Sequence, residues 1–455
     1  MDLRTPAATV PGRRATWPVV IAWALYDFAG TIFSVSILSV YFPLWLGSEL
    51  GAGADTVNYA AAGSALLVLL LSPFLGAVSD LGQRRKPYLV VLVSVSVVLT
   101  ALLGVSEEVA VIVALFVAAN FCYQSATVFY NALLPGVSAG RGTGRVSGYG
   151  TALGYVGAIF ALLFLQLFVG DASAVKELLG PLGWWIGTGA ARSSNAFVPT
   201  AVLYLLFSLP AFFFVPDPKV RRPMDVRPPA VYRDVITTIR NLRSYPGAGT
   251  FIAATVLYTD AANTAVSNMA LYGREVFGMS SGGIRNLLLF STVFAIVGSA
   301  GFGHLSDRVG PKRALVVVLL LWLVAIALAA VAPGPRVLLL VGPVVGIALG
   351  ATWTVSRAML VALAPPEKTG EFFGFYNLAG RFSAVAGPAL IALLLDAFGG
   401  LGAPSYRIAI GALAIVVLAG LYLLSRTPDV RPASAPASRA SREVETPEDN
   451  WEDGP

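Results

Sequence analysis

Twelve apolar segments, most about twenty residues or longer, decide what this chain can fold into. A helix needs about 20 residues to cross the roughly 30 Å hydrocarbon core of a bilayer, whereas a membrane β-strand is about half as long and alternates in polarity. Only 12% of the residues are charged and 56% are hydrophobic, against roughly 25% charged in soluble domains. We therefore predict an all-α integral membrane protein with twelve transmembrane helices, over residues 18–46, 57–79, 87–106, 109–134, 146–170, 197–215, 248–272, 284–303, 313–332, 336–362, 372–396 and 406–425.

The basic residues between these segments predict the orientation of the chain. Most of the 31 Lys and Arg residues fall in alternate loops, and loops rich in basic residues stay in the cytosol. This pattern places both termini in the cytosol and, for a bacterial source, the chain in the inner membrane. The first apolar segment is too long for a cleaved signal, so we expect it to remain as a helix. Positive charge spread over membrane loops argues against nucleic-acid binding.

The composition argues against several kinds of chemistry. The single cysteine, Cys122, permits no disulfide framework and no thiolate metal cluster. The single histidine, His304, argues against a multi-histidine metal site. The sequence has no G-x-x-x-x-G-K-[ST] nucleotide-binding loop, and it shows no cluster of residues that suggests an enzyme. We expect no metal, no cofactor and no enzymatic activity.

Four short motifs occur twice, in the same order. The sequence "WALYDFAGT" in the first segment matches "LYTDAANT" in the seventh, and "GAVSDLGQRRK" matches "GHLSDRVGPKR". Farther along, "YNALLP" matches "SRAML", and "TGRVSGYGTALGYVG" matches "TGEFFGFYNLAGRFS". The chain is therefore predicted to consist of two homologous six-helix halves. Parallel repeats of this kind build transporters whose site lies between the halves, near the middle of the membrane.

The repeat also sets the expected domain boundaries. We predict a cytosolic tail at 1–17, an N-terminal half at 18–215 and a C-terminal half at 248–426. A cytosolic linker at 216–247 joins them, and its "YRDVITTIRNL" stretch suits an amphipathic surface helix. Residues 427–455 are rich in Pro, Ala, Ser and Glu and are predicted to be a disordered cytosolic tail.

The loops after the second and eighth segments carry the most specific motif, G-x-x-x-D followed by basic residues. The glycines allow close helix packing, and the aspartates can accept hydrogen bonds from free N–H groups at the start of a neighbouring helix. The basic residues are expected to stay in the headgroup region, and the first copy is one residue shorter after its Asp. We predict a cytosolic gate formed by Gly76, Asp80, Arg84, Arg85, Gly303, Asp307, Gly310, Lys312 and Arg313.

These loops resemble the signature loop of the major facilitator superfamily. Other stretches resemble one branch of it, the vacuolar amino-acid effluxer-like family related to an autophagy permease: "WALYDFAGT", "FYNALLP", "GRVSGYGTALGYVG", "FSLPAFFFVPDP", "LYTDAANT" and "EFFGFYNLAGRFSAVAGP". Two positions depart from the family pattern, since Ala29-Gly30-Thr31 replaces a small polar pair and Ala261 replaces a glycine. The resemblance implies the major facilitator fold and transport of small organic solutes, with amino acids and export favoured.

Two aspartates, Asp27 and Asp260, lie inside apolar segments. A charge near the middle of a span costs about 2.5–3.5 kcal/mol on insertion scales, so both are expected to face the bundle interior or a water-filled cavity. The resemblance implies that their helices, the first and seventh, line the central cavity. One interpretation is that they bind a substrate ammonium group or a proton, and the other is that they tie two helices together by hydrogen bonds.

Two arginines also lie inside apolar segments. Arg381 is the expected partner of Asp260, although it could instead bind a substrate carboxylate. Its counterpart in the fifth segment is Tyr155, which leaves Asp27 facing only a phenol and makes Asp27 the better proton or ammonium site. Arg357 either binds substrate or extends to the inner headgroups. The candidate substrate or proton site is completed by residues that lie in repeated motifs or precede an aspartate: Asn131, Asn263, Tyr26 and Tyr258.

The sequence as a whole predicts a monomeric secondary transporter whose two halves rock about a central site, driven by a proton gradient. Its expected partners are a small solute, protons and membrane lipids. A transporter of sugars, drugs or lysolipids is the first alternative. The second is a receptor that binds a ligand on a transporter scaffold without moving it.

Overall fold

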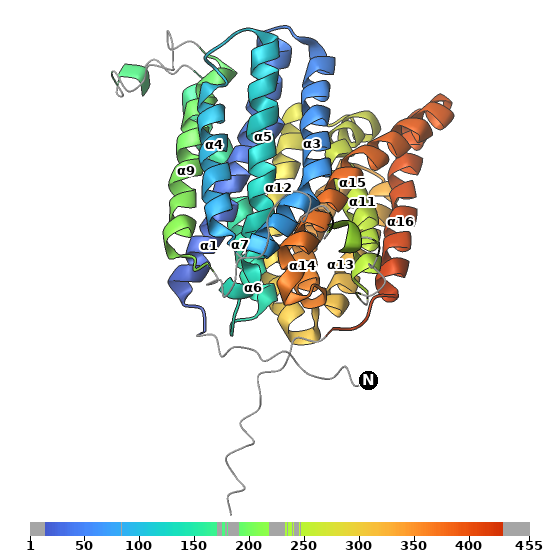
Figure 1. Ribbon diagram of the computed structural model, residues 1–455. Helices are drawn as coiled ribbons and strands as arrows, with labels where there is room; N and C mark the ends of the chain where they lie inside the picture. The colour runs from blue at the N-terminus through green and yellow to red at the C-terminus, as the bar shows by residue number, and fades with distance from the viewer. Residues whose placement is uncertain are drawn as a thin grey trace, which may run out of the picture.

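The chain forms a bundle of long helices (Figure 1). The computed structural model describes residues 14–82, 84–170, 191–217 and 247–430, with a few positions between them (175–177, 180, 233, 235–238, 240 and 245). Within these residues, each predicted apolar segment is helical. The first segment comprises α1 (Trp17–Phe33), η1 (Ser34–Val40), α2 (Tyr41–Leu44) and η2 (Trp45–Glu49). The others are α3 (Gly53–Gly82), α4 (Lys86–Leu102), α5 (Val109–Ala132), α7 (Thr143–Val169), α9 (Phe197–Phe214), α11 (Ala248–Phe277), α12 (Ser281–Val309), α13 (Pro311–Val331), α14 (Pro335–Leu363), α15 (Thr369–Phe398) and α16 (Ala403–Ser425).

Nine of the helices in the described part of the chain are long and apolar enough to cross a membrane. The remaining three differ for identifiable reasons. Helix α4 is shorter, at 17 residues. In α15 the side chains of residues 381–385 lie outside the described part of the chain, so its described apolar stretch begins only at Ala386. Helix α11 carries a run of polar side chains that it turns toward the interior. The all-α architecture with twelve spans is therefore confirmed.

The first span is not a regular α-helix. Residues Ser34–Val40 and Trp45–Glu49 form π-helical turns around the short helix α2. Turns of this kind are rare and often occur at functional sites. The apolar pattern predicted the span correctly but gave no sign of the irregular turns within it.

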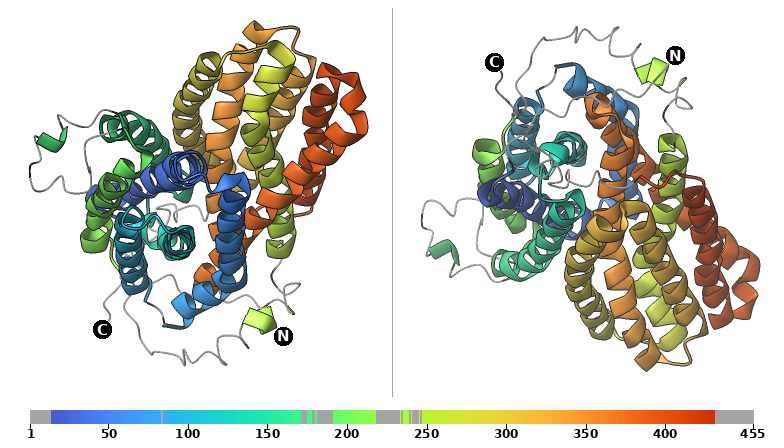
Figure 2. Two further views of the ribbon diagram at one scale, coloured as in Figure 1. Left: turned by 90° about the horizontal axis from the view of Figure 1, so that it is seen from above. Right: turned by 90° about the horizontal axis from the view of Figure 1, so that it is seen from below.

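The buried side chains form two main clusters, one in each half of the sequence. The first lies among α1 to α9, and the second lies mostly among α11 to α16. Figure 1 shows the first half, from blue to green, beside the second half, from yellow to red, and the end-on views in Figure 2 show the same separation. This arrangement fits two six-helix halves with separate cores.

The two halves meet where α3 packs on α15 and where α7 packs on α12. Glycines allow this close approach. A Cβ atom at Gly76 would lie 2.3 Å from the carbonyl oxygen of Gly370, and one at Gly303 would lie 2.6 Å from that of Gly144. Such distances exclude any side chain, so the helix backbones touch. Both contacts lie at one end of the bundle, where α1 begins and α16 ends. We call this end the motif face; it is the end predicted to be cytosolic.

Most of the predicted linker, and most of each predicted tail, lie outside the described residues. Within the linker, residues 235–238 are helical. Val235 packs against Ala77 of α3 and Phe375 of α15, and Lys368 Nζ donates to Thr238 Oγ1 over 2.7 Å. This part of the linker therefore contacts both halves at the motif face.

Candidate functional site

A polar cavity of about 320 Å³ lies between the two halves. The N-terminal half contributes η1 and α5, and the C-terminal half contributes α11, α14 and α15. Amides, hydroxyls and one guanidinium face the space, which suits a small polar solute better than an apolar one. Its lining residues are Ser34, Leu38, Tyr123, Gln124, Thr127, Asn131, Thr255, Thr259, Asn263, Trp353, Arg357, Tyr376, Asn377 and Gly380.

Helical periodicity explains why these side chains face one space. Residues four apart lie on the same face of an α-helix. On α11 the lining positions are Thr255, Thr259 and Asn263, and on α14 they are Trp353 and Arg357. The same spacing places the lining residues of α5 at positions 123, 127 and 131. Each cavity helix thus presents a narrow polar stripe, and the remainder of its surface packs against neighbours or is apolar.

The cavity contains two candidates from one repeated motif. In the match between "YNALLP" and "SRAML", Asn131 corresponds to Arg357. Both line the cavity, from α5 and α14 respectively. The Oδ1 atom of Asn131 is buried and has no hydrogen-bond donor among the described residues. An amide residue from one half thus lines the same space as a guanidinium from the other half.

Arg357 pairs with Asp27 across the two halves. Its Nη1 atom lies 2.8 Å from Asp27 Oδ2, and the side chains are 12% and 17% exposed. The expectation that Asp27 faces only a phenol is therefore wrong. Of the two alternatives for Arg357, this pairing disfavours extension to the headgroups. Asp27 packs against α7, where a Cβ at Gly150 would lie 2.6 Å from Oδ2. Of the pair, Arg357 is the member that lines the cavity.

Asp260 occupies a different environment from its counterpart Asp27. Its side chain is buried, and its Oδ1 atom accepts a hydrogen bond of 2.7 Å from the backbone N–H of Gly387 in α15. A Cβ at Gly387 would lie 2.8 Å from the same oxygen, so the glycine lets the carboxylate approach. Asp260 thus ties α11 to α15 inside the C-terminal half. The side chain of Arg381, its predicted partner, lies outside the described residues.

The tyrosines that precede or nearly precede the aspartates are core residues, which corrects their assignment to the site. Tyr26 is 2% exposed, packs against Tyr130, and shares a hydrogen bond of 3.3 Å with Tyr204. Tyr258 is fully buried, and its hydroxyl lies 2.8 Å from Ser356 Oγ and 2.9 Å from Thr255 Oγ1. Both hydroxyls are thus used within their own half. The sequence position beside an aspartate was misleading, because neighbours in a helix point in different directions.

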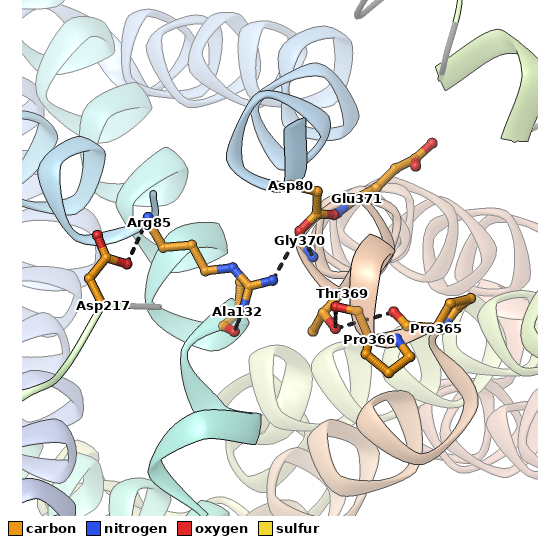
Figure 3. A network of polar contacts seen from close by, with 9 residues as sticks. All are labelled: Asp80, Arg85, Ala132, Asp217, Pro365, Pro366, Thr369, Gly370 and Glu371. Atoms are coloured by element: carbon orange, nitrogen blue, oxygen red, sulfur yellow. Dashed lines mark hydrogen bonds and ion pairs between the residues drawn. The ribbon is translucent and has the colours of Figure 1, made fainter. Parts of the chain in front are cut away.

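Asp80 sits at the first turn of α15, on the opposite half (Figure 3). Its two carboxylate oxygens accept from the N–H groups of Gly370, at 2.9 Å, and Glu371, at 2.7 Å. Arg85 Nη2 pairs with the same carboxylate at 3.0 Å, and Arg85 Nη1 donates to the carbonyl of Ala132. The shorter spacing in this copy of the motif therefore leaves the expected contact with a helix N-terminus intact.

Asp307 makes the matching contact at the start of α7. It accepts from the N–H of Gly144, at 2.8 Å, and from both the N–H and the Nε of Arg145, each at 3.0 Å. The two contacts differ in their third residue, because Glu371 takes the place in α15 that Arg145 takes in α7. Gly310, at φ +95°, makes the turn from α12 to α13.

Several basic residues of the motif bind helix ends at the motif face. Lys86 Nζ donates to the carbonyl of Val215 at the end of α9, over 2.9 Å. Lys312 Nζ donates to the carbonyls of Ser425 and Thr427 at the end of α16, and Arg313 pairs with Asp429 at 3.2 Å. A cation is favourable at a helix C-terminus because the last carbonyls are unpaired there. Arg84 is exposed.

Sequence reasoning missed the cavity residues Trp353, Tyr376, Thr127, Thr255 and Thr259. The threonines had a signal in the sequence. Thr127 lies four residues before Asn131, and Thr255 and Thr259 lie eight and four residues before Asn263, on otherwise apolar helices. Tyr376 lines the cavity, and its Oη is buried with no hydrogen-bond partner in the described part of the chain. A single polar residue in a membrane helix usually contacts a neighbouring helix, whereas a stripe of several indicates a cavity.

A second, apolar cavity of about 110 Å³ lies among α11, α12, α13 and α14. Tyr155 of α7 reaches it from the N-terminal half, and Met269, Trp322 and Leu349 are among its lining residues. The molecule therefore offers both a polar space between the halves and an apolar space within one half.

Comparison with known proteins agrees with this architecture. Residues 54–432 match the family model described as vacuole effluxer Atg22 like. An uncharacterised MFS-type transporter, YxiO, of Bacillus subtilis is 26% identical over 422 residues, which cover 90% of this chain and 94% of that protein. The autophagy-related protein 22 of Kluyveromyces lactis is 22% identical, with coverage of 82% and 87%.

Solved structures of low sequence identity share the fold. The human organic anion transporter MFSD10 superposes with a TM-score of 0.66 at 15% identity, covering 91% of this chain and all of that one. The Escherichia coli fucose:proton symporter FucP gives 0.65 at 12% identity, with the same coverage. Together with the two-half architecture, the family match shows that the chain is a multi-pass membrane protein and a secondary transporter rather than an enzyme. It belongs to the Atg22-like effluxer family of the major facilitator superfamily.

Proposed function

We propose that this transporter exports small amino acids or closely related solutes by alternating access, driven by a proton gradient. The observation that carries the proposal is the polar cavity between the halves, which Arg357 lines from the C-terminal half and Asn131 from the N-terminal half. A guanidinium binds a carboxylate well, and amide or hydroxyl oxygens accept hydrogen bonds from an ammonium group. An amino acid requires both kinds of contact.

Direction and driving force are inferred from known proteins and from one carboxylate inside the bundle. The family description, vacuole effluxer, favours export. The similar structure FucP is described as a proton symporter, which favours proton coupling but not a direction, because export driven by inward proton flow requires exchange of the solute for protons. A carboxylate inside the bundle, such as Asp27, is a suitable group to take and release a proton. We further propose that both termini are cytosolic, that the protein lies in the inner membrane if its source is bacterial, and that it acts as a monomer.

The apolar cavity favours one second candidate function, transport of a drug-like or lipid-like solute. Met269, Trp322 and Leu349 would contact apolar groups, and Tyr155 lies between this space and the Asp27–Arg357 pair. A solute with a large apolar part would use this cavity more than the polar one.

Solute release from proteoliposomes tests these alternatives. Vesicles with purified protein are loaded with an amino-acid mixture, and release is measured by mass spectrometry with and without an imposed pH gradient. Gradient-dependent release of particular amino acids, lost in Arg357→Gln, would support the proposal. The matched control is Arg336→Gln, which changes an exposed arginine near the other end of α14. Folded protein that releases no amino acid would exclude this substrate class and direct the search to lipids and drugs.

A further inference from the structure

We propose that the Asp27–Arg357 pair locks the two halves together, and that an anionic group of the solute opens this lock by replacing Asp27 on Arg357. The inference rests on the proposed transport function, because it assumes that the halves separate at the motif face. It adds a mechanism by which the carrier senses its cargo, and it requires the cargo to carry a carboxylate or a similar anion.

The position of the pair supports a role as a lock. Asp27 lies ten residues after the start of α1, and Arg357 lies six residues before the end of α14. At 1.5 Å per residue these positions are about 15 Å and 9 Å from the motif-face ends of their helices. Ser34 and Leu38 of the cavity follow Asp27 on the same span, farther from that face. The pair thus lies in the part of the interface toward the motif face, at about the level of the cavity residues Thr255 and Tyr376, which are each seven residues from the motif-face ends of their helices.

Each member is fixed to its own half. The Asp27 side chain packs tightly on α7 at Gly150. Within α1, Thr31 Oγ1 donates to the carbonyl of Asp27 over 2.8 Å. Arg357 follows Ser356, whose Oγ shares a hydrogen bond with Tyr258 inside the C-terminal half. Because neither backbone can follow the other, separation of the halves at the motif face would break the pair. Two largely buried charges would then lose their partner, which is costly unless another group replaces it.

Arg357 is open to such a replacement from the cavity side. A guanidinium has five N–H donors in a planar fork, and Asp27 Oδ2 binds Nη1. The side chain also lines the cavity, whereas Asp27 does not. A carboxylate that arrives from the cavity can therefore reach Arg357 without first displacing Asp27. Asn131 Oδ1, on the facing wall, could accept an N–H from the same solute.

Thiol labelling of the purified full chain in detergent tests the lock without measuring transport. The reporter is Ser147→Cys in a Cys122→Ser background. Ser147 is fully buried on α7, and its Oγ donates to the carbonyl of Thr354 on α14 over 2.9 Å. It lies between Gly144, at the contact with α12, and Gly150, at the contact with Asp27. A water-soluble maleimide can reach the new thiol only when the halves separate at the motif face.

The variants separate a lock from a general loss of packing. Asp27→Asn and Arg357→Gln should each raise the labelling rate roughly tenfold or more, since each leaves a buried charge unpaired. Asp27→Glu retains the charge and should label nearly as slowly as the parent. The matched control is Asp260→Asn, which removes the corresponding carboxylate but affects a bond within one half. Unchanged labelling in Asp27→Asn, or equal acceleration in Asp260→Asn, would overturn the lock.

Three small probes test the opening by an anion: L-alanine, propionate, which lacks the ammonium group, and ethylamine, which lacks the carboxylate. Propionate and alanine should accelerate labelling of the parent, and ethylamine should not. Acceleration by ethylamine alone, or by none of the three, would overturn displacement by an anion. The result is independent of the release assay, because a responsive lock in a protein that moves no amino acid would contradict the proposed function alone.

Discussion

At the residue scale, the contact between α7 and α12 depends on the absence of a side chain at Gly303. A Cβ there would lie 2.6 Å from the carbonyl oxygen of Gly144. We expect Gly303→Ala to push the halves apart at a cost of about 1–3 kcal/mol, as overpacking of tight contacts does. Measurements of the apparent melting temperature in detergent, and of labelling at Ser147→Cys, should show a lower Tm and a faster reaction.

The same helix provides the control for this prediction. Gly301 lies two residues earlier on α12, and no atom lies within 4 Å of the position that its Cβ would take. Gly301→Ala should therefore leave Tm and labelling close to those of the parent, or stabilise α12 slightly through its better helix propensity. If the two substitutions behaved alike, backbone contact between the halves would not be the reason for glycine at 303.

Residue identities were predicted better than residue partners. The sequence singled out Asp27, Arg357, Asn131 and Asn263, and the structure places Asp27 beside the cavity and the other three on its wall. It failed to join Asp27 with Arg357, because an internal repeat aligns positions within each half and contains no information on how the halves face each other. It also failed at Tyr26, because adjacency along a helix says nothing about direction.

At the scale of helices, the two contacts between Asp and a helix N-terminus are not equivalent. Asp80 is 6% exposed and holds Arg85, which is 13% exposed, whereas Asp307 is 16% exposed and its partner Arg145 is 44% exposed. Exposed ion pairs contribute little because water screens them. The α3–α15 contact should therefore depend more strongly on its aspartate than the α7–α12 contact does.

Neutralising each aspartate tests this difference. Asp80→Asn should cost about 1.5–3 kcal/mol, the range for hydrogen bonds to a charged group, and it leaves Arg85 partly buried without its carboxylate. Asp307→Asn should cost less, because Arg145 can be solvated. Both variants are compared by melting temperature and by labelling at Ser147→Cys. The melting temperature decides the ranking, because the labelling reporter lies nearer to the Asp307 contact. A larger fall in melting temperature in Asp307→Asn than in Asp80→Asn would contradict it.

The positions of the helices could be predicted, but their irregularities could not. Length and apolarity alone located every span, because a bilayer imposes a minimum length on any helix that crosses it. The π-helical turns of Ser34–Val40 have no comparable signature in the sequence. They place Ser34 and Leu38 on the cavity wall, so a part of the site depends on backbone geometry that periodicity does not encode.

At the scale of the whole molecule, the repeat predicted two halves, and the structure shows how they meet. Glycines in α3, α7, α12 and α15 form the contacts at the motif face, and the Asp27–Arg357 pair adds an ionic contact closer to the cavity. The sequence indicated that such helices could shift, but not which face would be closed. A transporter of this kind alternates between two arrangements of its halves, so one sequence must be compatible with both.

The last prediction concerns the orientation of the molecule in the membrane, which depends on basic residues near the motif face. We expect a reporter that fluoresces only in the cytosol to be active at the C-terminus and when fused after Val215, and inactive after Gly170. Alkaline phosphatase, which is active only outside the cytosol, should give the reverse pattern at the same three positions. The opposite result at all positions would contradict the positive-inside interpretation. The closed motif face would then lie outside the cell.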